Sequence, residues 1–301
     1  MTGRRSYLTR RSRGYPPLLA AIHDPPRRLY LRGEGSVEML SRPAVAVVGT
    51  RTCSPYGAQV ARRLGRELAA AGATVVSGLA RGIDAEAHRG ALEAGGPTVA
   101  VLGCGIDRDY PRAHAALARR ISELGLLVSE YEPGVEPAPW RFPARNRIIA
   151  GLAAATVIVE ARARSGALIT ADFALEDGRE VFAVPGEITS ALSRGTNELL
   201  RLGAAPLLEA NDVLAALGLE EAPARRSHPL SDQASRLLEL LADRSASADE
   251  LAERSGLAAD AVAATLVELE LSGEAVCAEG VYRAQGTQDV PCKQTKVTDP
   301  R

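Results

Sequence analysis

The sequence predicts an α/β fold, an extended Rossmann-like parallel sheet, followed by a carboxyl-terminal winged-helix domain. From residue 44 onward, short β-branched apolar runs alternate with helical segments, which is typical of a parallel sheet with helices on both faces. After residue 230, three short helical segments precede a hairpin pattern. A chain of 301 residues is long enough for one large domain and one small one. No apolar run approaches the ~18–20 residues that span a bilayer, so no membrane contact is expected.

The first 43 residues are expected to form a basic arm and an extended segment. Residues 1–14 contain five arginines and no apolar stretch of the kind found in secretory signals, which favours a disordered arm. Residues 15–43 are rich in proline and are interpreted as an extended lead into the large domain.

The Rossmann-like domain is expected over residues 44–218. Its strands are predicted at 44–49, 74–77, 98–102, 126–130, 156–160 and 180–184. Ser54 is suited to cap the first helix, which Pro55 opens. Ligand sites in such sheets lie beyond the carboxyl ends of the strands, so the segments that follow the strands should converge there.

Cationic segments flank the strand predicted at residues 156–160. Residues 141–164 contain five arginines and one acid, Glu160. Arginine forks and the N–H groups of a helix start both bind anions, which predicts a phosphate-contacting surface. The residues expected to converge on it are Thr50, Arg51, Arg81, Phe142, Arg145, Asn146, Arg147, Arg164, Ser165 and Gly166.

Other chemistries fit the sequence poorly. Gly103-x-Gly105 lacks the third glycine of a dinucleotide fingerprint, and no phosphate-loop motif of an ATPase occurs. The four histidines and four cysteines are scattered, so we expect neither a metal nor a cofactor, and the cysteine usage suits the cytosol. Ser165 and Thr170 have no evident histidine and acid partners and are interpreted as helix-capping and phosphate-binding groups.

A linker is expected at residues 219–230, a winged helix at 231–285 and a disordered tail at 286–301. The three helices are predicted at 234–241, 248–255 and 259–271, and the hairpin at 275–283. Residues 231–285 contain 11 acids and 4 arginines, and the third helix is expected to expose Asp260, Ala261, Thr265 and Glu268. A DNA-contacting winged helix needs positive charge, so this domain is predicted to contact protein or to pack.

Four ordered motifs resemble those of the DNA-processing protein A (DprA/Smf) family across about residues 15–217. They are Gly78-Leu79-Ala80-Arg81-Gly82-Ile83-Asp84 with Ala87-His88, Phe142-Pro143-x-Arg145-Asn146-Arg147-Ile148-Ile149-Ala150-Gly151-Leu152, Ser165-Gly166-x-Leu168-Ile169-Thr170-Ala171, and Val184-Pro185-Gly186 with Gly195-Thr196-Asn197. Many relatives carry a small helical domain at the amino end, for which residues 1–43 leave no room.

The resemblance implies a non-enzymatic protein that binds single-stranded DNA, forms a homodimer through the Rossmann-like domain and loads the RecA recombinase during natural transformation. Carried onto this sequence, it places Arg51, Phe142 and the run from Arg145 to Arg147 in the strand-binding pocket, with Ser165 and Gly166 at its floor. The residue types support this interpretation independently, because arginines bind phosphates and Phe142 is able to stack on a base.

Two alternatives come from other classes. A nucleoside-monophosphate phosphoribohydrolase shares this type of sheet, but here Pro185-Gly186 is followed by Glu187, and Gly195-Thr196 comes nine residues after Gly186. The compact phosphate loop of that enzyme is therefore absent from the sequence. A transcriptional regulator acting through the winged helix is disfavoured by the acidic charge of that domain.

Overall fold

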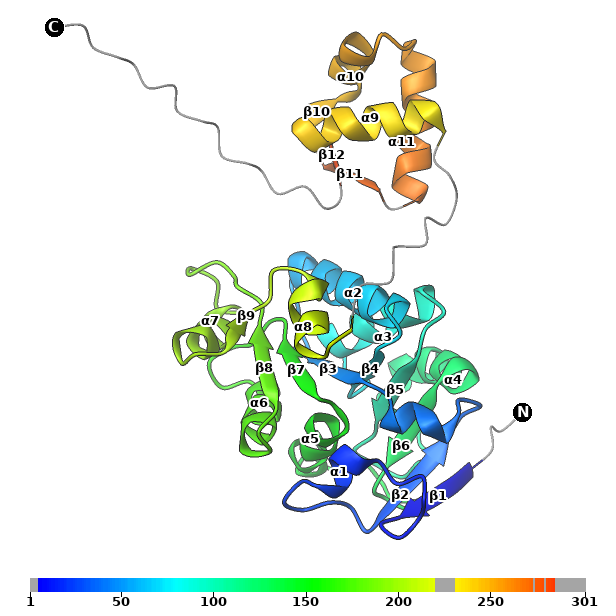
Figure 1. Cartoon of the computed structure of the whole chain (residues 1–301), viewed down its shortest axis with the longest axis vertical. Helices are drawn as coiled ribbons and strands as arrows, with labels where there is room; N and C mark the ends of the chain where they lie inside the picture. Colours follow the sequence, from blue (N-terminus) through cyan, green and yellow to red (C-terminus); the bar gives the residue numbers. More distant parts are fainter. Residues whose placement is uncertain (1–4, 220–230, 273, 279, 285–301) are drawn as a thin grey trace, which may run out of the picture. The chain divides into compact units, whose positions relative to one another are not determined.

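A computed structural model describes residues 5–219, 231–272, 274–278 and 280–284. The chain divides into two compact units, one within residues 1–224 and the other within residues 225–301 (Figure 1). The expected tail at 286–301 and nearly all of the expected linker lie outside the described residues. Each unit is considered by itself below.

The larger unit is built on one nine-stranded sheet with the order β1-β2-β6-β5-β4-β3-β7-β8-β9. From β6 to β9 every neighbouring pair is parallel, which confirms the predicted mostly parallel sheet. The strands are β1 (Arg5–Thr9), β2 (Arg28–Arg32), β3 (Ala44–Val48), β4 (Thr74–Ser77), β5 (Thr98–Val101), β6 (Leu126–Ser129), β7 (Ala155–Ile158), β8 (Glu180–Ala183) and β9 (Ala205–Pro206).

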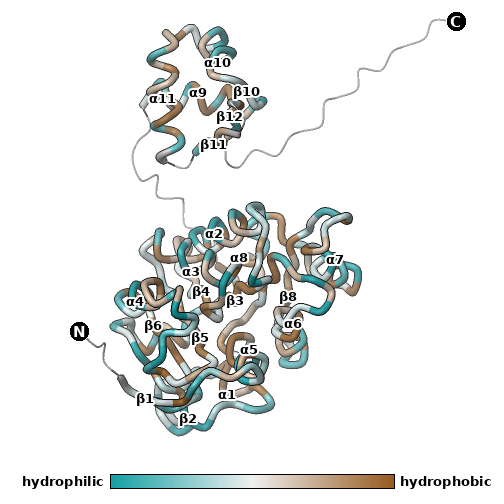
Figure 2. The backbone as a smooth tube through the Cα atoms, turned by 180° about the vertical axis from the view of Figure 1, so that it is seen from behind, coloured by the Kyte–Doolittle hydropathy of each residue, from teal (hydrophilic) through white to brown (hydrophobic). Residues whose placement is uncertain are grey.

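Helices cover both faces of this sheet, because its central strands are apolar on both sides. In β3, Val45 and Val47 pack against one helix layer, while Ala46 and Val48 pack against the other. Figure 2 shows the strands as the apolar interior of the unit. One layer contains α1 (Pro17–Ala20), α5 (Arg141–Leu152) and α6 (Gly166–Glu176), and the other α2 (Pro55–Ala70), α3 (Ile83–Glu93), α4 (Ala115–Leu124) and α8 (Ala210–Ala216). The α7 helix (Arg194–Arg201) lies near β8.

The amino-terminal segment differs from the expected basic arm, since residues 5–9 form a strand. β1 and β2 form an antiparallel hairpin, and β2 pairs with β6, with Tyr30 opposite Ser129. The physical reason is the alternation in β2, where Leu29 and Leu31 are buried in the core of the larger unit. The hairpin therefore extends the sheet (Figure 1).

The smaller unit is a winged helix, as predicted. It consists of α9 (Asp232–Asp243), α10 (Ala248–Ser255), α11 (Ala259–Leu271) and a sheet of β10 (Ala246–Ser247), β11 (Ala275–Ala278) and β12 (Val281–Ala284). Leu237, Leu251 and Leu266 are buried in its own core. Thr265 was expected on an exposed face but is buried, and its hydroxyl donates to the carbonyl oxygen of Ala261 (2.7 Å).

No helix within the described residues combines the length and the apolar character that a bilayer crossing requires.

Candidate nucleic-acid interface

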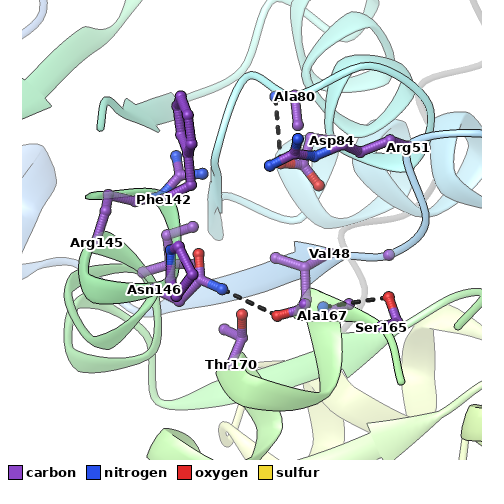
Figure 3. A pocket seen from close by; sticks show the side chains of 14 residues that line it. Val48, Arg51, Ala80, Asp84, Phe142, Arg145, Asn146, Ser165, Ala167 and Thr170 are labelled. Carbon is purple, nitrogen blue, oxygen red and sulfur yellow. Dashed lines mark hydrogen bonds between the residues drawn. The ribbon is translucent and has the colours of Figure 1, made fainter. Parts of the chain in front are cut away.

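A cavity of about 220 Å³ lies where β3 and β4 end and where α5 and α6 begin. Six of the predicted site residues line it: Arg51, Phe142, Arg145, Asn146, Ser165 and Gly166. They come from three segments that are far apart in the sequence, and Figure 3 shows the side chains of all but Gly166 gathered around the opening. The convergence of strand ends and helix starts is that expected of an open α/β sheet.

Phe142 lies in the first turn of α5 and forms an aromatic wall of the cavity. The guanidinium carbon of Arg51 lies 5.4 Å from the centre of its ring. Tyr110 stacks against it at a centroid distance of 5.3 Å. A Cβ at Gly103 would lie 2.8 Å from Phe142 Cδ1, so only glycine lets the ring lie this close to the end of β5. Phe142 is half-buried, which leaves part of the ring accessible.

The start of α6 forms the floor. Ser165 caps the helix by accepting a hydrogen bond from the N–H of Ala167 (3.3 Å). The Asn146 amide donates to the carbonyl oxygen of Gly166 (3.0 Å), which fixes α5 against this turn. The first turn of a helix presents N–H groups that have no partner within the helix, and its dipole favours an anion.

Carboxylates of this chain already accept hydrogen bonds from two neighbouring segments, the start of α2 and the turn before α3. Glu160 accepts from the N–H of Ser54 (2.9 Å) and from its hydroxyl (2.5 Å) at the start of α2. Asp84 accepts from the N–H groups of Gly78 (3.1 Å) and Ala80 (3.3 Å) in the turn before α3. The first turn of α6, in contrast, contains no acidic residue. The N–H groups at the start of α6 therefore face no carboxylate from their own turn.

Arg145 supports the cavity from within, and its exposed fraction is 3%. Its Nη1 donates to the carbonyl oxygens of Gly78 (2.8 Å) and Val101. Burial lowers the pKa of Arg145 to about 10, and the Asp84 carboxylate offsets part of this effect. Burial raises the pKa of Asp84, while the positive charge of Arg145 lowers it. Arg145 stays cationic at neutral pH, and its guanidinium holds three segments of backbone together.

Arg147, which was predicted to contact phosphate, is placed elsewhere. It forms ion pairs with Glu130 (2.7 Å) and with Asp24 (3.2 Å) and is not among the residues that line the cavity. Because residues two apart on a helix point to nearly opposite sides, Arg145 and Arg147 do not face the same ligand. Arg147 instead ties α5 to β6 and to the amino-terminal segment.

Three further predicted residues do not line the cavity. Thr50 is buried; its N–H donates to the carbonyl oxygen of Glu160 (2.7 Å), so its role here is structural. Arg81 and Arg164 are exposed. Arg164 directly precedes Ser165, the cap of α6.

Asp84 and Tyr110 belong to the site but were not predicted from the sequence. Asp84 was not among the predicted site residues, whereas it is buried and lines the cavity. Its position in the Gly78–Asp84 turn was the available signal. Tyr110 has no such signal, because its contact with Phe142 joins segments 32 residues apart in an irregular region.

Comparisons with known proteins identify the family of this chain. The profile of the family described as DNA recombination-mediator protein A matches residues 6–218, and that of the DprA winged helix domain matches residues 221–280. Protein Smf of Escherichia coli is 43% identical over 279 residues, which cover 89% of this chain and 74% of Smf. The DNA processing protein DprA of Streptococcus pneumoniae is 46% identical over 205 residues, which cover 67% of this chain and 70% of that protein.

Solved structures show the same similarity. The crystal structure of DNA processing protein A from Streptococcus pneumoniae matches with a TM-score of 0.67 and 43% identity, over 71% of this chain and 74% of that one. DNA processing protein A from Helicobacter pylori, whose structure addresses its single-stranded DNA binding mode, matches with a TM-score of 0.64 and 33% identity. That match covers 72% of this chain and 98% of the other.

Proposed function

Because the chain belongs to the DNA recombination-mediator protein A family, we propose that it binds single-stranded DNA at the cavity between β3, α5 and α6. The observation that carries the proposal is the meeting of Arg51, Phe142 and the α6 start in one opening. A single strand presents phosphates and unpaired base faces. These three features supply a cation and N–H donors for the phosphates and an aromatic face for a base.

Each part of the cavity has a distinct task in this proposal. A base stacks on the accessible part of the Phe142 ring, which Tyr110 and Arg51 already contact, so the ring is held in place before the strand arrives. Arg51, exposed beside that ring, neutralises a phosphate, and the first turn of α6 holds another. Binding of this kind requires no nucleophile, so the proposed role is non-enzymatic.

The same geometry favours single strands over duplexes. The cavity is concave and small, at about 220 Å³, and Phe142 lies inside it rather than on a flat surface. A duplex keeps its base faces stacked on one another, and exposing one costs a few kcal/mol. A single strand presents the base face without that cost. We therefore infer a preference for single-stranded DNA.

The proposal includes two protein partners, a RecA recombinase and a second copy of this chain. We propose that the protein protects incoming strands and hands them to a RecA recombinase during natural transformation, and that it acts as a homodimer through its larger unit. The support is the membership of the family together with the single-strand site described above. Strand loading of RecA onto DNA coated with a single-strand-binding protein, with and without this chain, tests the transfer.

The phosphoribohydrolase alternative is not favoured by the structure. The N–H of Gly186 donates to the side-chain oxygen of Asn197 (3.2 Å), and the Asn197 amide donates to the carbonyl oxygen of Gly186 (2.9 Å). The loop that would hold a phosphate in that enzyme is thus hydrogen-bonded within the chain. An assay for base release from nucleoside monophosphates distinguishes the two functions, and we expect no turnover.

Arg51→Ala and Arg147→Ala form a matched pair for testing the site. Arg51→Ala is expected to weaken binding of any single strand and to lower the slope of log affinity against log salt by about 0.7, the value for one lost phosphate contact. Arg147→Ala is expected to leave the slope unchanged, because its guanidinium is paired with Glu130 and Asp24. Trp140 is the one tryptophan in the chain and directly precedes α5, so its fluorescence is the signal to follow in the titration.

The salt slopes of the two variants show whether the phosphate contact is specific to Arg51. Equal slope changes in both variants would show that the phosphate contact is not specific to the Arg51 side of the cavity. An unchanged slope in the folded Arg51→Ala variant would contradict the assignment of Arg51. Duplex DNA of the same sequence serves as the reference ligand in both titrations.

Removing the winged helix is expected to leave DNA binding intact. A chain ending at Leu219 keeps the whole described part of the larger unit, and Leu219 itself packs against its core. The cut removes a domain with 11 acids and 4 arginines, which repels a DNA backbone. Affinity should stay the same or rise slightly near 0.01 M salt, where the screening length is about 30 Å.

The affinity for one single-stranded oligonucleotide is measured with the full chain and with the chain that ends at Leu219. A loss of about tenfold or more, about 1.4 kcal/mol, in a truncated protein that stays folded would show that the winged helix grips DNA directly.

A further inference from the structure

The β1–β2 hairpin carries an aromatic cluster that the proposed cavity does not use. The rings of Tyr7 and Tyr30 lie 5.8 Å apart at an angle of 49°. The guanidinium carbon of Arg28 lies 5.6 Å from the centre of the Tyr7 ring, and its Nη1 is 3.5 Å from the Tyr30 hydroxyl. Tyr7 is 55% exposed, so a large part of its ring faces solvent. Tyr7, Arg28 and Tyr30 are called the hairpin cluster below.

The hairpin cluster lies near the end of the sheet where the cavity opens, on the face that α4 covers, since Tyr7 pairs with Tyr30 and Tyr30 packs against the α4 side of the core. Phe142 contacts Gly103, which follows β5, and β1 is three strands from β5 in the sheet order. At about 4.8 Å per strand, the separation is roughly 14 Å. β1 runs parallel to β6, so both strands end at the edge of the sheet where the cavity opens.

Two sets of contacts bridge this interval. Tyr110, which stacks on Phe142, follows Asp109, and Asp109 pairs with Arg32 of β2 at 2.6 Å. A second aromatic group lies at the start of α5, where the guanidinium carbon of Arg141 is 4.9 Å from the Trp140 ring and 5.1 Å from the Tyr131 ring. Trp140 is 63% exposed. Tyr131 lies two residues after Ser129, the residue opposite Tyr30 in the sheet.

Charge along this route favours a polyanion. Exposed arginines surround the hairpin cluster at positions 10, 11, 13 and 27, in addition to Arg28 itself. Two acids on the route are paired, Asp109 with Arg32 and Glu136 with Arg108, and the exposed Glu132 beside Tyr131 is outnumbered by these arginines. Alternating aromatic faces and guanidinium groups are the surface on which successive bases stack while their phosphates are neutralised.

We propose that single-stranded DNA leaving the cavity continues past Trp140 and Tyr131 to the β1–β2 hairpin, where a base stacks on Tyr7 and Arg28 contacts a phosphate. This inference rests on the proposed function of the cavity and adds a second stacking subsite to it. The subsite is sequence-tolerant, because every base has a face that stacks. Strands too short to cover both sites occupy the cavity alone.

The test compares two oligothymidylates, one of about six nucleotides and one of about twenty, on the full chain. Tyr7→Val removes the ring while keeping a β-branched residue that suits a strand. It is expected to weaken binding of the longer strand by about 5- to 140-fold, which corresponds to one lost base stack of about 1–3 kcal/mol. Binding of the shorter strand should not change.

Further variants sharpen the result. Tyr7→Phe keeps the ring and should bind both strands as the parent does. Arg28→Ala should lower the salt slope by about 0.7 for the longer strand only. Thermal unfolding of each variant, followed by circular dichroism, establishes that the hairpin is still folded.

The outcomes distinguish the two proposals. If the parent binds the short strand and Tyr7→Val binds the long strand normally, the hairpin subsite is overturned and the cavity assignment stands. Equal losses on both strands in a folded Tyr7→Val variant also overturn the subsite, because Tyr7 would then act through the cavity. If the parent binds neither strand, both proposals fall.

Discussion

Arg145→Met is expected to lower the free energy of unfolding of the larger unit by about 3–5 kcal/mol, the usual cost of removing one partner of a buried charge pair. The substitution leaves the buried Asp84 carboxylate without the positive charge that lowers its pKa most. It also removes the donors to the carbonyl oxygens of Gly78 and Val101. Urea unfolding followed by Trp140 fluorescence measures this unit alone, because the chain has a single tryptophan.

A second substitution identifies the source of the loss. Asp84→Asn in the Arg145→Met background removes the uncompensated charge and retains an oxygen that is able to accept from the N–H groups of Gly78 and Ala80. The double variant should therefore be more stable than Arg145→Met alone. Simple addition of the two single effects would show that the charges are not coupled.

The loss should also depend on pH. Burial raises the pKa of Asp84, and Arg145 offsets part of that rise, so the pKa rises further when Arg145 is removed. In the variant, the native state then holds a proton that the unfolded chain has released at the same pH. The deficit is therefore full above the raised pKa and shrinks as the pH falls through it. A deficit that is constant from neutral to acidic pH would point to the lost backbone hydrogen bonds instead.

The strand pattern and the helix signals were predictable because they are local. In β3 and β4, runs of β-branched and small apolar residues are buried on both faces, and Ser54 caps α2 as its position before Pro55 indicates. Local patterns of this kind need no knowledge of distant partners. The winged helix was predictable for the same reason, since its helices have apolar faces that form a core of their own.

The roles of individual arginines were not predictable from their clustering. The run from Arg141 to Arg147 has three arginines, and the sequence gives each the same charge. The structure separates them because the run is helical from its first residue: Arg145 points into the core, while Arg147 pairs with Glu130. Pro143 is compatible with that helix since it lies in the first turn, where no hydrogen bond is lost.

The amino-terminal hairpin was missed because its partner is distant. Leu29, Tyr30 and Leu31 show the alternation of a half-buried strand, but β2 pairs with β6, about 100 residues further on. Proline and arginine in the surrounding sequence masked the pattern and favoured an extended arm. Pairing between strands that are distant in the sequence produces only a weak pattern in the sequence around each strand.

Phe142→Ala is expected to weaken single-strand binding by about 1–3 kcal/mol, or about 5- to 140-fold, if a base stacks on the ring. Phe142 forms a wall of the cavity, with Arg51 on one side and Tyr110 stacked against it. Its first-turn position on α5 leaves it half-buried, so the ring also contributes to packing against Gly103. Some loss of stability is therefore expected as well, and affinity must be measured on protein shown to be folded.

An abasic strand separates stacking from packing. A phosphodiester chain without bases retains the contacts with Arg51 and the α6 start but has nothing to place on the ring. The parent protein and Phe142→Ala should bind it equally, whereas they should differ on an oligothymidylate of the same length. Phe142→Tyr, which keeps an aromatic face, is expected to bind both strands as the parent does. Equal weakening of Phe142→Ala on the abasic and base-containing strands would mean that the ring only shapes the cavity, and base stacking at this position would have to be abandoned.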